Sequence, residues 1–335
     1  MDGSYKDRKA GLIFFGILTL LIGLIDLLFV PLMLLAPKLA ASQPNSASAP
    51  AAHQVFFSAG TGLLLAIVFI WLGIGSILTR RWARALILIG AWAWLIIGIF
   101  SLGWLIFMWP QMQTIFNASQ APGQAPLPDA ARSMIAVVMI AFVAFIYIIV
   151  PAVWILFYRS RHVKATCEAR DPRVRWTDRC PLPVLALALW SVLSAMATFT
   201  MALFYNQALP FFGLILSGLA GTICYLIIAA IWFYAGWSIY KLRRVGWWIA
   251  FIGMVIWPAS AFLTWRSHSI AEVLAKMDLT SAQARQVSGL MSYSVMSWSA
   301  VAIALPMLAY LLYVRRYFRM ETGALSGRVK AQRGG

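Results

Sequence analysis

The sequence predicts an all-α integral membrane protein with eight transmembrane helices, arranged as two parallel four-helix repeats. Three observations support this prediction: the composition, the length of the apolar segments, and a recurrence between the two halves of the chain. The chain has 335 residues, of which 62% are hydrophobic and 11% are charged. Soluble domains are about 45–50% apolar, so this composition places the chain in a bilayer.

Eight apolar segments are long enough to cross a membrane, because a spanning helix needs about 17–25 residues. They lie at roughly 11–35, 55–78, 85–108, 133–157, 183–205, 211–240, 246–265 and 293–314. An even number of spans puts both termini on the same side of the membrane.

The basic residues indicate which side this is. Of the 27 Lys and Arg residues, 22 lie in the N-terminal segment, the turns at 79–84 and 241–245, the central polar region 159–181 and the C-terminal region 315–335. Loops rich in Lys and Arg stay in the cytoplasm. We therefore expect a cytoplasmic (inner) membrane protein with both termini in the cytoplasm. The net charge of +17 is then an orientation signal, and no nucleic-acid partner is expected.

The two halves of the chain resemble each other in order. The segment AGTGLLLAIVFIWLGIG at 59–75 matches AGTICYLIIAAIWFYAG at 220–236, the Arg80-Arg81 turn recurs at Arg243-Arg244, and PAVWILFYRSR at 151–161 resembles PMLAYLLYVRR at 306–316. A four-helix unit has an even number of spans, so both copies insert the same way up, as in transporters with parallel repeats. The alternative is that Gly, Trp and Arg-Arg recur by composition alone.

These observations predict four regions. The first four-helix repeat occupies 1–160, a basic cytoplasmic linker loop 161–181, the second repeat 182–320, and a basic cytoplasmic tail 321–335. Within the second repeat, Gly213, Ser217 and Gly221 follow one another at four-residue spacing. Small residues at this spacing let two membrane helices pack closely, so we expect these three to form a helix-packing face.

Asp26 is the one acidic residue inside a predicted span. An Asp near the centre of a membrane helix costs about 2.5–3.5 kcal/mol on insertion scales, and such residues often bind ions or protons. Pro31, five residues on, frees a backbone carbonyl of the preceding turn. Asp26 is therefore a candidate ion or proton site. The alternative is a structural or interfacial role near the outer headgroups.

The central segment RHVKATCEARDPRVRWTDRCP, residues 161–181, is the second candidate site. Basic side chains beside a membrane bind anionic lipid headgroups or a protein partner, and a solvated linker is the alternative. The candidate docking residues are Arg161, Lys164, Arg170, Arg173, Arg175, Trp176 and Arg179.

No catalytic residue, metal or cofactor is expected. His162, Cys167 and Cys180 are of the types that bind zinc, but no Cys-x-x-Cys pair is present. The three histidines all fall in loops, where they cannot serve chemistry inside the bilayer. A membrane-embedded enzyme needs its nucleophile, base or metal ligands within the spans.

Two functions remain. The first is a non-catalytic multi-pass protein that acts as a scaffold or accessory subunit of a membrane complex. The second is a small-solute or ion permease with its pathway between the two repeats and Asp26 as the coupling acid. The spans contain few polar residues, whereas a substrate pathway usually needs more of them. The first function is therefore favoured.

Overall fold

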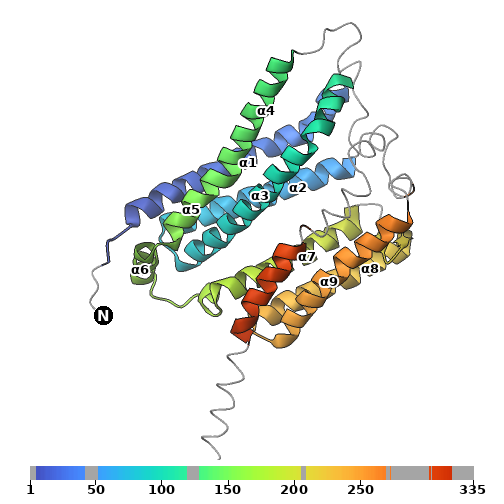
Figure 1. The fold of residues 1–335 in the computed structure, drawn as a ribbon. Helices are drawn as coiled ribbons and strands as arrows, with labels where there is room; N and C mark the ends of the chain where they lie inside the picture. Colours follow the sequence, from blue (N-terminus) through green and yellow to red (C-terminus); the bar gives the residue numbers. More distant parts are fainter. Residues whose placement is uncertain are drawn as a thin grey trace, which may run out of the picture. The chain divides into compact units, whose positions relative to one another are not determined.

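The computed structural model describes residues 5–41, 52–118, 128–204, 209–268, 272, 302 and 304–318. The chain folds into two compact units (Figure 1). Unit 1 comprises residues 1–34 and 58–177, and unit 2 comprises residues 35–57 and 178–335. The central segment up to Thr177 therefore folds with unit 1.

The described chain is nearly all helical, as predicted. Unit 1 contains most of α1 (Lys9–Ala41) and of α2 (Ala52–Ile77), whose residues 35–41 and 52–57 belong to unit 2. It also contains α3 (Arg81–Ala118), α4 (Asp129–Ala144), the π-helix η1 (Phe145–Ile149), α5 (Val150–Arg159), α6 (Arg161–Arg170) and the start of the short 3-10 helix η2 (Trp176–Asp178), which ends in unit 2. In unit 2 they are α7 (Leu182–Phe204), β1 (Leu209–Phe211), β2 (Leu214–Leu216), α8 (Gly218–Tyr240) and α9 (Arg244–Ser267). Residues 304–318 form a further helix.

Seven helices of the described chain are long and apolar enough to cross a membrane. They are Lys9–Leu35, Val55–Ile77, Arg81–Trp109, Ala130–Arg159, Leu182–Leu203, Gly218–Tyr240 and Arg244–Ser267. Each overlaps one of the first seven predicted spans. Residues 293–301 and 303 of the eighth, at 293–314, lie outside the described residues, so the count of eight stays a prediction.

Large apolar side chains cover the outside of these helices. Leu28 and Leu156 are 74% exposed and Leu219 is 76% exposed. In water such a surface is unfavourable at about 25 cal/mol per Å², whereas lipid tails solvate it. The helices therefore belong in a bilayer, and the chain is a membrane protein.

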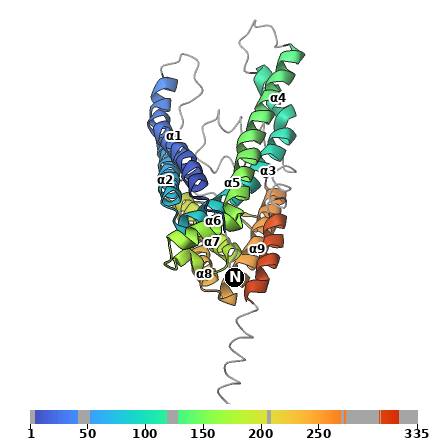
Figure 2. The same cartoon turned by 90° about the vertical axis from the view of Figure 1, so that its left-hand side faces the viewer.

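In unit 1, α1 lies beside α2 (Figure 2), and glycines form the close contacts between them. A Cβ atom placed on Gly73 would lie 2.8 Å from the Gly16 carbonyl oxygen and 2.7 Å from the Leu20 nitrogen. One on Gly23 would lie 2.9 Å from the Ala66 carbonyl oxygen. Small residues seven apart on both helices thus bring the two backbones together, which is how membrane helices gain packing energy.

The long fourth span of unit 1 contains a π-helical turn, η1, with a local cause. Pro151 has no N–H and cannot bond the carbonyl of Tyr147, four residues before it. This carbonyl lies against α3 at Gly98, where an added Cβ would meet the Tyr147 backbone. Gly98 therefore leaves room for the Tyr147 backbone.

Polar contacts join the first, second and fourth spans of unit 1 near one end. The Ser76 hydroxyl donates to the Leu12 carbonyl (3.0 Å) and accepts from the Tyr158 hydroxyl (2.7 Å). One further contact joins the spans, in which Trp154 Nε1 donates to the Thr19 hydroxyl at 3.3 Å. Buried hydrogen bonds of this kind fix the register of helices in a membrane.

In unit 2, α7 and α8 also approach closely at a glycine. A Cβ atom on Gly236 of α8 would lie 3.0 Å from the Ala188 carbonyl oxygen and 2.8 Å from the Val192 side chain of α7. Gly236 contacts two residues four apart on α7, Ala188 and Val192, just as Gly73 contacts Gly16 and Leu20 on α1. By these contacts Gly236 corresponds to Gly73, whereas the sequence comparison aligned it with Gly75.

The turn after the second helix has the same hydrogen bonds in both units. Thr79 N–H donates to Ser76 and Arg80 N–H to Gly75; Leu242 N–H donates to Ile239 and Arg243 N–H to Ser238. Thr79 and Leu242 both have positive φ, at 54° and 58°. The basic turns that recur in the sequence therefore also share one backbone conformation. The match does not extend to Tyr158 and Tyr313, since the first is fully buried and the second is 47% exposed.

A β-hairpin replaces the first residues of the predicted span 211–240. Strands β1 and β2 are antiparallel, with Leu209 opposite Leu216 and Phe211 opposite Leu214. The two turn residues, Phe212 and Gly213, both have positive φ, as a tight two-residue hairpin requires. The predicted helical start was wrong because this turn was not recognised, and the helix begins at Gly218.

Candidate functional site

The central polar segment contains a short helix, α6, with defined ends. Ser160 precedes it in a non-helical conformation, and Asp171 follows it with φ −127° and ψ 78°. Asp171 is followed by Pro172, and a residue before proline is disfavoured in the helical region. The helix therefore stops where its sequence predicts a break.

One face of α6 is buried in unit 1. Val163 and Thr166 are fully buried and Cys167 is 1% exposed. These three residues follow the i, i+3, i+4 spacing of one helical face. Residues 161–170 are thus a helix packed against unit 1 by one face, so this part of the segment is not a fully solvated linker.

The N-terminal segment of residues 5–8, which precedes α1, contacts α6 through hydrogen bonds and an ion pair. Arg8 N–H donates to the Thr166 hydroxyl at 3.0 Å, and Lys6 N–H donates to Nδ1 of His162 at 3.3 Å. Arg170 pairs with Asp7 at 2.7 Å. This guanidinium, together with the Lys9 N–H, lowers the pKa of Asp7.

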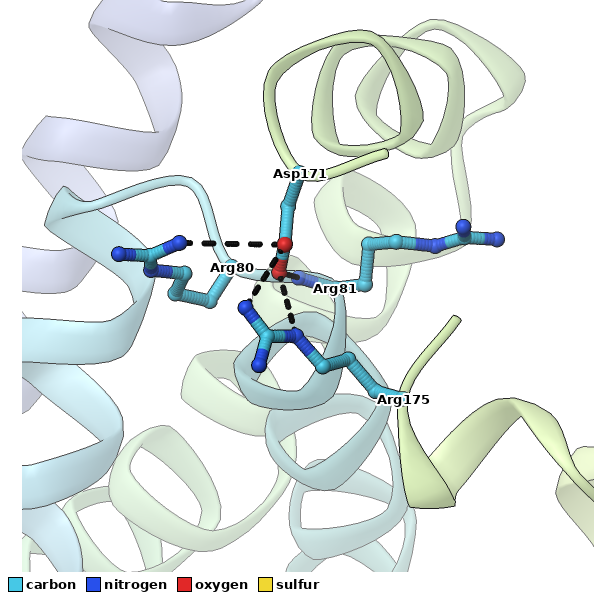
Figure 3. A network of polar contacts seen from close by, with 4 residues as sticks. All are labelled: Arg80, Arg81, Asp171 and Arg175. Atoms are coloured by element: carbon cyan, nitrogen blue, oxygen red, sulfur yellow. Dashed lines mark hydrogen bonds and ion pairs between the residues drawn. The ribbon is translucent and has the colours of Figure 1, made fainter. Parts of the chain in front are cut away.

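Asp171 holds α6 on the α2–α3 turn (Figure 3). Its carboxylate is 2% exposed and accepts two hydrogen bonds from Arg175, at 2.8 and 3.1 Å. The Arg80 guanidinium lies 3.8 Å from the Asp171 carboxylate, and the Arg81 backbone N–H donates to this carboxylate at 3.4 Å. The Arg81 side chain extends away from Asp171.

These donors determine the charge state of Asp171. The hydrogen bond from Arg175 lowers the pKa of its carboxyl although burial opposes this, and the Arg81 N–H and the Arg80 charge act in the same direction. Asp171 is therefore ionised at neutral pH. Nearby, Glu168 pairs with Arg81 at 3.4 Å and with Lys164 at 3.8 Å.

The two cysteines of the segment are buried and protonated. Burial raises the pKa of Cys167 to about 11 and that of Cys180 to about 11. A thiolate is the form that binds metal or attacks an electrophile. In the described residues, no group of three or more His, Cys, Asp or Glu side chains is placed to hold a metal ion.

The predicted docking residues divide into two sets. Arg170, Arg175 and Lys164 form ion pairs with Asp7, Asp171 and Glu168. Arg161, Arg173 and Arg179 are exposed, and Trp176 is 40% exposed. No hydrogen bond or ion pair to another described residue involves the side chain of Arg161 or Arg173. Val174, beside Arg173, is 74% exposed. Arg161 begins α6, and Arg173 and Val174 follow its end; we refer to these three exposed residues together as the basic surface of unit 1.

Asp26 lies on α1, half-buried, three residues beyond the close contact of Gly23 with α2. No described cationic side chain lies within ion-pair distance of it. The α1 helix runs through Pro31 to Ala41. Asp26 is thus separate from the α6 network.

The predicted packing face of Gly213, Ser217 and Gly221 does not form. Gly213 lies in the hairpin turn, Ser217 precedes α8, and only Gly221 is helical, where it is buried. Helical spacing has no meaning across a hairpin, which is why this prediction was wrong.

The hairpin turn is instead held by polar side chains of α9 that the sequence did not reveal. Phe212 N–H donates to the Ser260 hydroxyl at 3.0 Å, and Gly213 N–H donates to the Thr264 hydroxyl at 3.0 Å. One nitrogen of His268 lies 2.9 Å from the Gly213 carbonyl. The available signal was Ser260 and Thr264, four residues apart on one face of α9, with His268 directly after the helix.

No known protein family, curated protein or solved structure matches the chain.

Proposed function

We propose that the chain is a non-catalytic, multi-pass protein of the cytoplasmic membrane that serves as a scaffold or accessory subunit of a membrane complex. Both termini and α6 lie in the cytoplasm in this proposal, since the basic segments are on one side. A duplicated four-helix unit forms the membrane part, as the shared turn and the shared glycine packing suggest.

The observation that supports this function is the way α6 is fixed. Glu168 of α6 and Asp171 at its end form ion pairs within unit 1, whereas Arg161 and Arg173 are exposed and form no ion pair with another described residue. A rigidly held basic and apolar surface loses little conformational entropy on binding. It therefore suits an acidic surface of a membrane-protein partner, and anionic lipid headgroups are its second ligand.

Affinity purification from native membranes in a mild detergent, followed by mass spectrometry, tests this function. We expect a stoichiometric partner with the wild type and a several-fold lower recovery with Arg161→Gln/Arg173→Gln, because exposed ion pairs contribute about 0.2–1 kcal/mol each. Lys241→Gln/Arg316→Gln removes the same charge from exposed positions in unit 2 and is the matched control.

Equal recovery with both double variants would contradict docking at the basic surface. Recovery of the wild type without a partner would favour the permease alternative. The observation behind that alternative is the half-buried Asp26 without a described cationic neighbour inside a span. A transport activity that Asp26→Asn leaves unchanged would then exclude Asp26 as its coupling acid.

A further inference from the structure

The tip of the β1–β2 hairpin in unit 2 exposes large apolar side chains. Phe211 is 40% exposed, Phe212 is 46% exposed and Leu214 is 60% exposed. The two phenyl rings lie edge to face, with their centroids 5.2 Å apart. Water around an apolar tip of this kind is unfavourable, so a contact with an apolar partner would stabilise it.

Phe212 occupies a backbone conformation that is unfavourable for its side chain. Its φ is 46°, in the left-handed region that Gly, Asn and Asp adopt at lower cost than a bulky residue. Strained residues cluster at positions where the side chain has a role. The turn itself does not require a phenyl ring at this position, so the ring needs another explanation.

The position of the turn along α9 gives its depth. Phe212 N–H is bonded to Ser260, and Gly213 N–H is bonded to Thr264. At a helical rise of about 1.5 Å per residue, Ser260 lies about 24 Å and Thr264 about 30 Å along the span that begins at Arg244. The hydrocarbon core of a bilayer is about 30 Å thick. The turn therefore lies at the far edge of this core and not in the water beyond it.

The polar groups of the turn are satisfied without water. A two-residue hairpin leaves the N–H groups of its turn residues without a strand partner, and non-helical backbone at membrane depth needs partners from the protein. The Ser260 hydroxyl accepts from Phe212 N–H at 3.0 Å and donates to the Pro210 carbonyl at 3.3 Å. The Thr264 hydroxyl accepts from Gly213 N–H at 3.0 Å. Ser260 is 5% exposed and Thr264 is fully buried, so the protein itself supplies these bonds.

We propose that the hairpin tip inserts into the lipid leaflet opposite the basic turn at 241–245, where Phe211, Phe212 and Leu214 contact acyl chains just below the headgroups. The hydroxyls of α9 replace the water that the turn loses, and lipid contact offsets the strain at Phe212. The hairpin thus anchors this edge of unit 2 to the leaflet. Naming that leaflet the outer one rests on the topology in the proposed function, whereas the insertion itself does not.

Spin labelling of the full-length protein in phosphatidylcholine nanodiscs tests the insertion. A nitroxide is attached to Leu214→Cys in a variant without the native cysteines. Its collision rate with oxygen, which concentrates in the bilayer, is compared with that for a water-soluble nickel chelate. Leu193→Cys on α7, at a residue 58% exposed, is the lipid reference, and Val174→Cys, at a residue 74% exposed, is the water reference. We expect an oxygen-to-nickel ratio at position 214 several-fold above that at position 174 and close to that at position 193.

Two variants test the cause of the insertion. Thr264→Val keeps the shape of the side chain but removes the acceptor of Gly213 N–H, so the label should become several-fold more accessible to the nickel chelate. Thr200→Val is the matched control, since the hydroxyl of Thr200 bonds the Ala197 carbonyl within α7. Phe212→Asn suits the positive φ and keeps the turn, but it removes the ring and should also raise nickel accessibility.

An oxygen-to-nickel ratio at position 214 equal to that at position 174 would overturn the proposal, because the tip would then lie in water. Unchanged nickel accessibility in both Thr264→Val and Phe212→Asn would also overturn it. An inserted label in a protein whose termini lie outside the cell would support the insertion and contradict the topology in the proposed function, so the two failures are distinguishable.

Discussion

Asp171 is the residue on which the attachment of α6 depends. Its buried carboxylate accepts hydrogen bonds from Arg175 and from the Arg81 backbone and lies near Arg80. A buried acceptor that loses its charge while its donors remain leaves charged groups poorly paired. Arg80 and Asp171 are distant in the chain, and only folding brings them together.

We predict that Asp171→Asn destabilises unit 1 by about 1–3 kcal/mol. The loss is smaller than for a fully buried ion pair because Arg80 and Arg175 are partly exposed to solvent. The change also releases α6, so trypsin cleaves faster after Arg173. Thermal unfolding and limited proteolysis in detergent measure the two effects. Glu168→Gln is the control, because that side chain is 41% exposed.

The ion pair between Asp171 and Arg175 also makes the stability of unit 1 depend on pH. The pKa of Asp171 is lower in the folded protein than its ordinary value of 3.8, so the stabilisation is complete above about pH 4 and decreases as pH falls through the folded pKa. The wild type therefore loses more stability than Asp171→Asn on acidification below pH ~4. Identical losses in both proteins would contradict the role of this carboxylate.

At the scale of helices, small residues determine which helices pack in each unit. Gly16 and Gly73 in unit 1, and Ala188 and Gly236 in unit 2, mark the same close approach. The sequence comparison found the glycines of the second helix but paired Gly236 with Gly75. Close contacts between neighbouring helices decide the register, and these are not visible in a single segment.

We predict that Gly73→Val destabilises the α1–α2 pair by about 1–3 kcal/mol through overpacking, because its Cβ would lie within 2.8 Å of backbone atoms of α1. The loss is measured as a lower unfolding midpoint in detergent. Gly60→Ala on the same helix is the control, since nothing lies within 4 Å of an added Cβ there. Since Gly→Ala raises helix propensity, Gly60→Ala should not destabilise, and a similar loss for both variants would contradict the close approach as the cause.

At the scale of the whole molecule, the exposed apolar faces and the seven apolar helices identify a membrane protein. The positions of these helices were predicted from the sequence to within a few residues, apart from the hairpin before α8. A span is a local property of composition and length, which explains the agreement. The hairpin depends on two residues with positive φ and on bonds from α9, and neither changes the local hydropathy.

We predict that both termini lie in the cytoplasm, because an even number of spans, here eight, returns the chain to the side on which it begins. Single cysteines introduced at Tyr5 and at Gly335, in a variant without native cysteines, should react with a membrane-impermeant thiol reagent only after the cells are opened. A cysteine at Ser46 should react in intact cells, and it serves as the control for access. Reaction of the two terminal cysteines on opposite sides would require an odd number of spans.

The sequence by itself determined the membrane class, the approximate ends of seven helices and the basic character of the central segment, because each of these follows from nearby residues. Tertiary structure decided which face of α6 is buried, which arginines are paired with Asp171 and Glu168, and where the hairpin turn lies along α9. These features join residues far apart in the chain. Their positions follow from backbone contacts at glycines and from buried hydrogen bonds, which composition and periodicity do not encode.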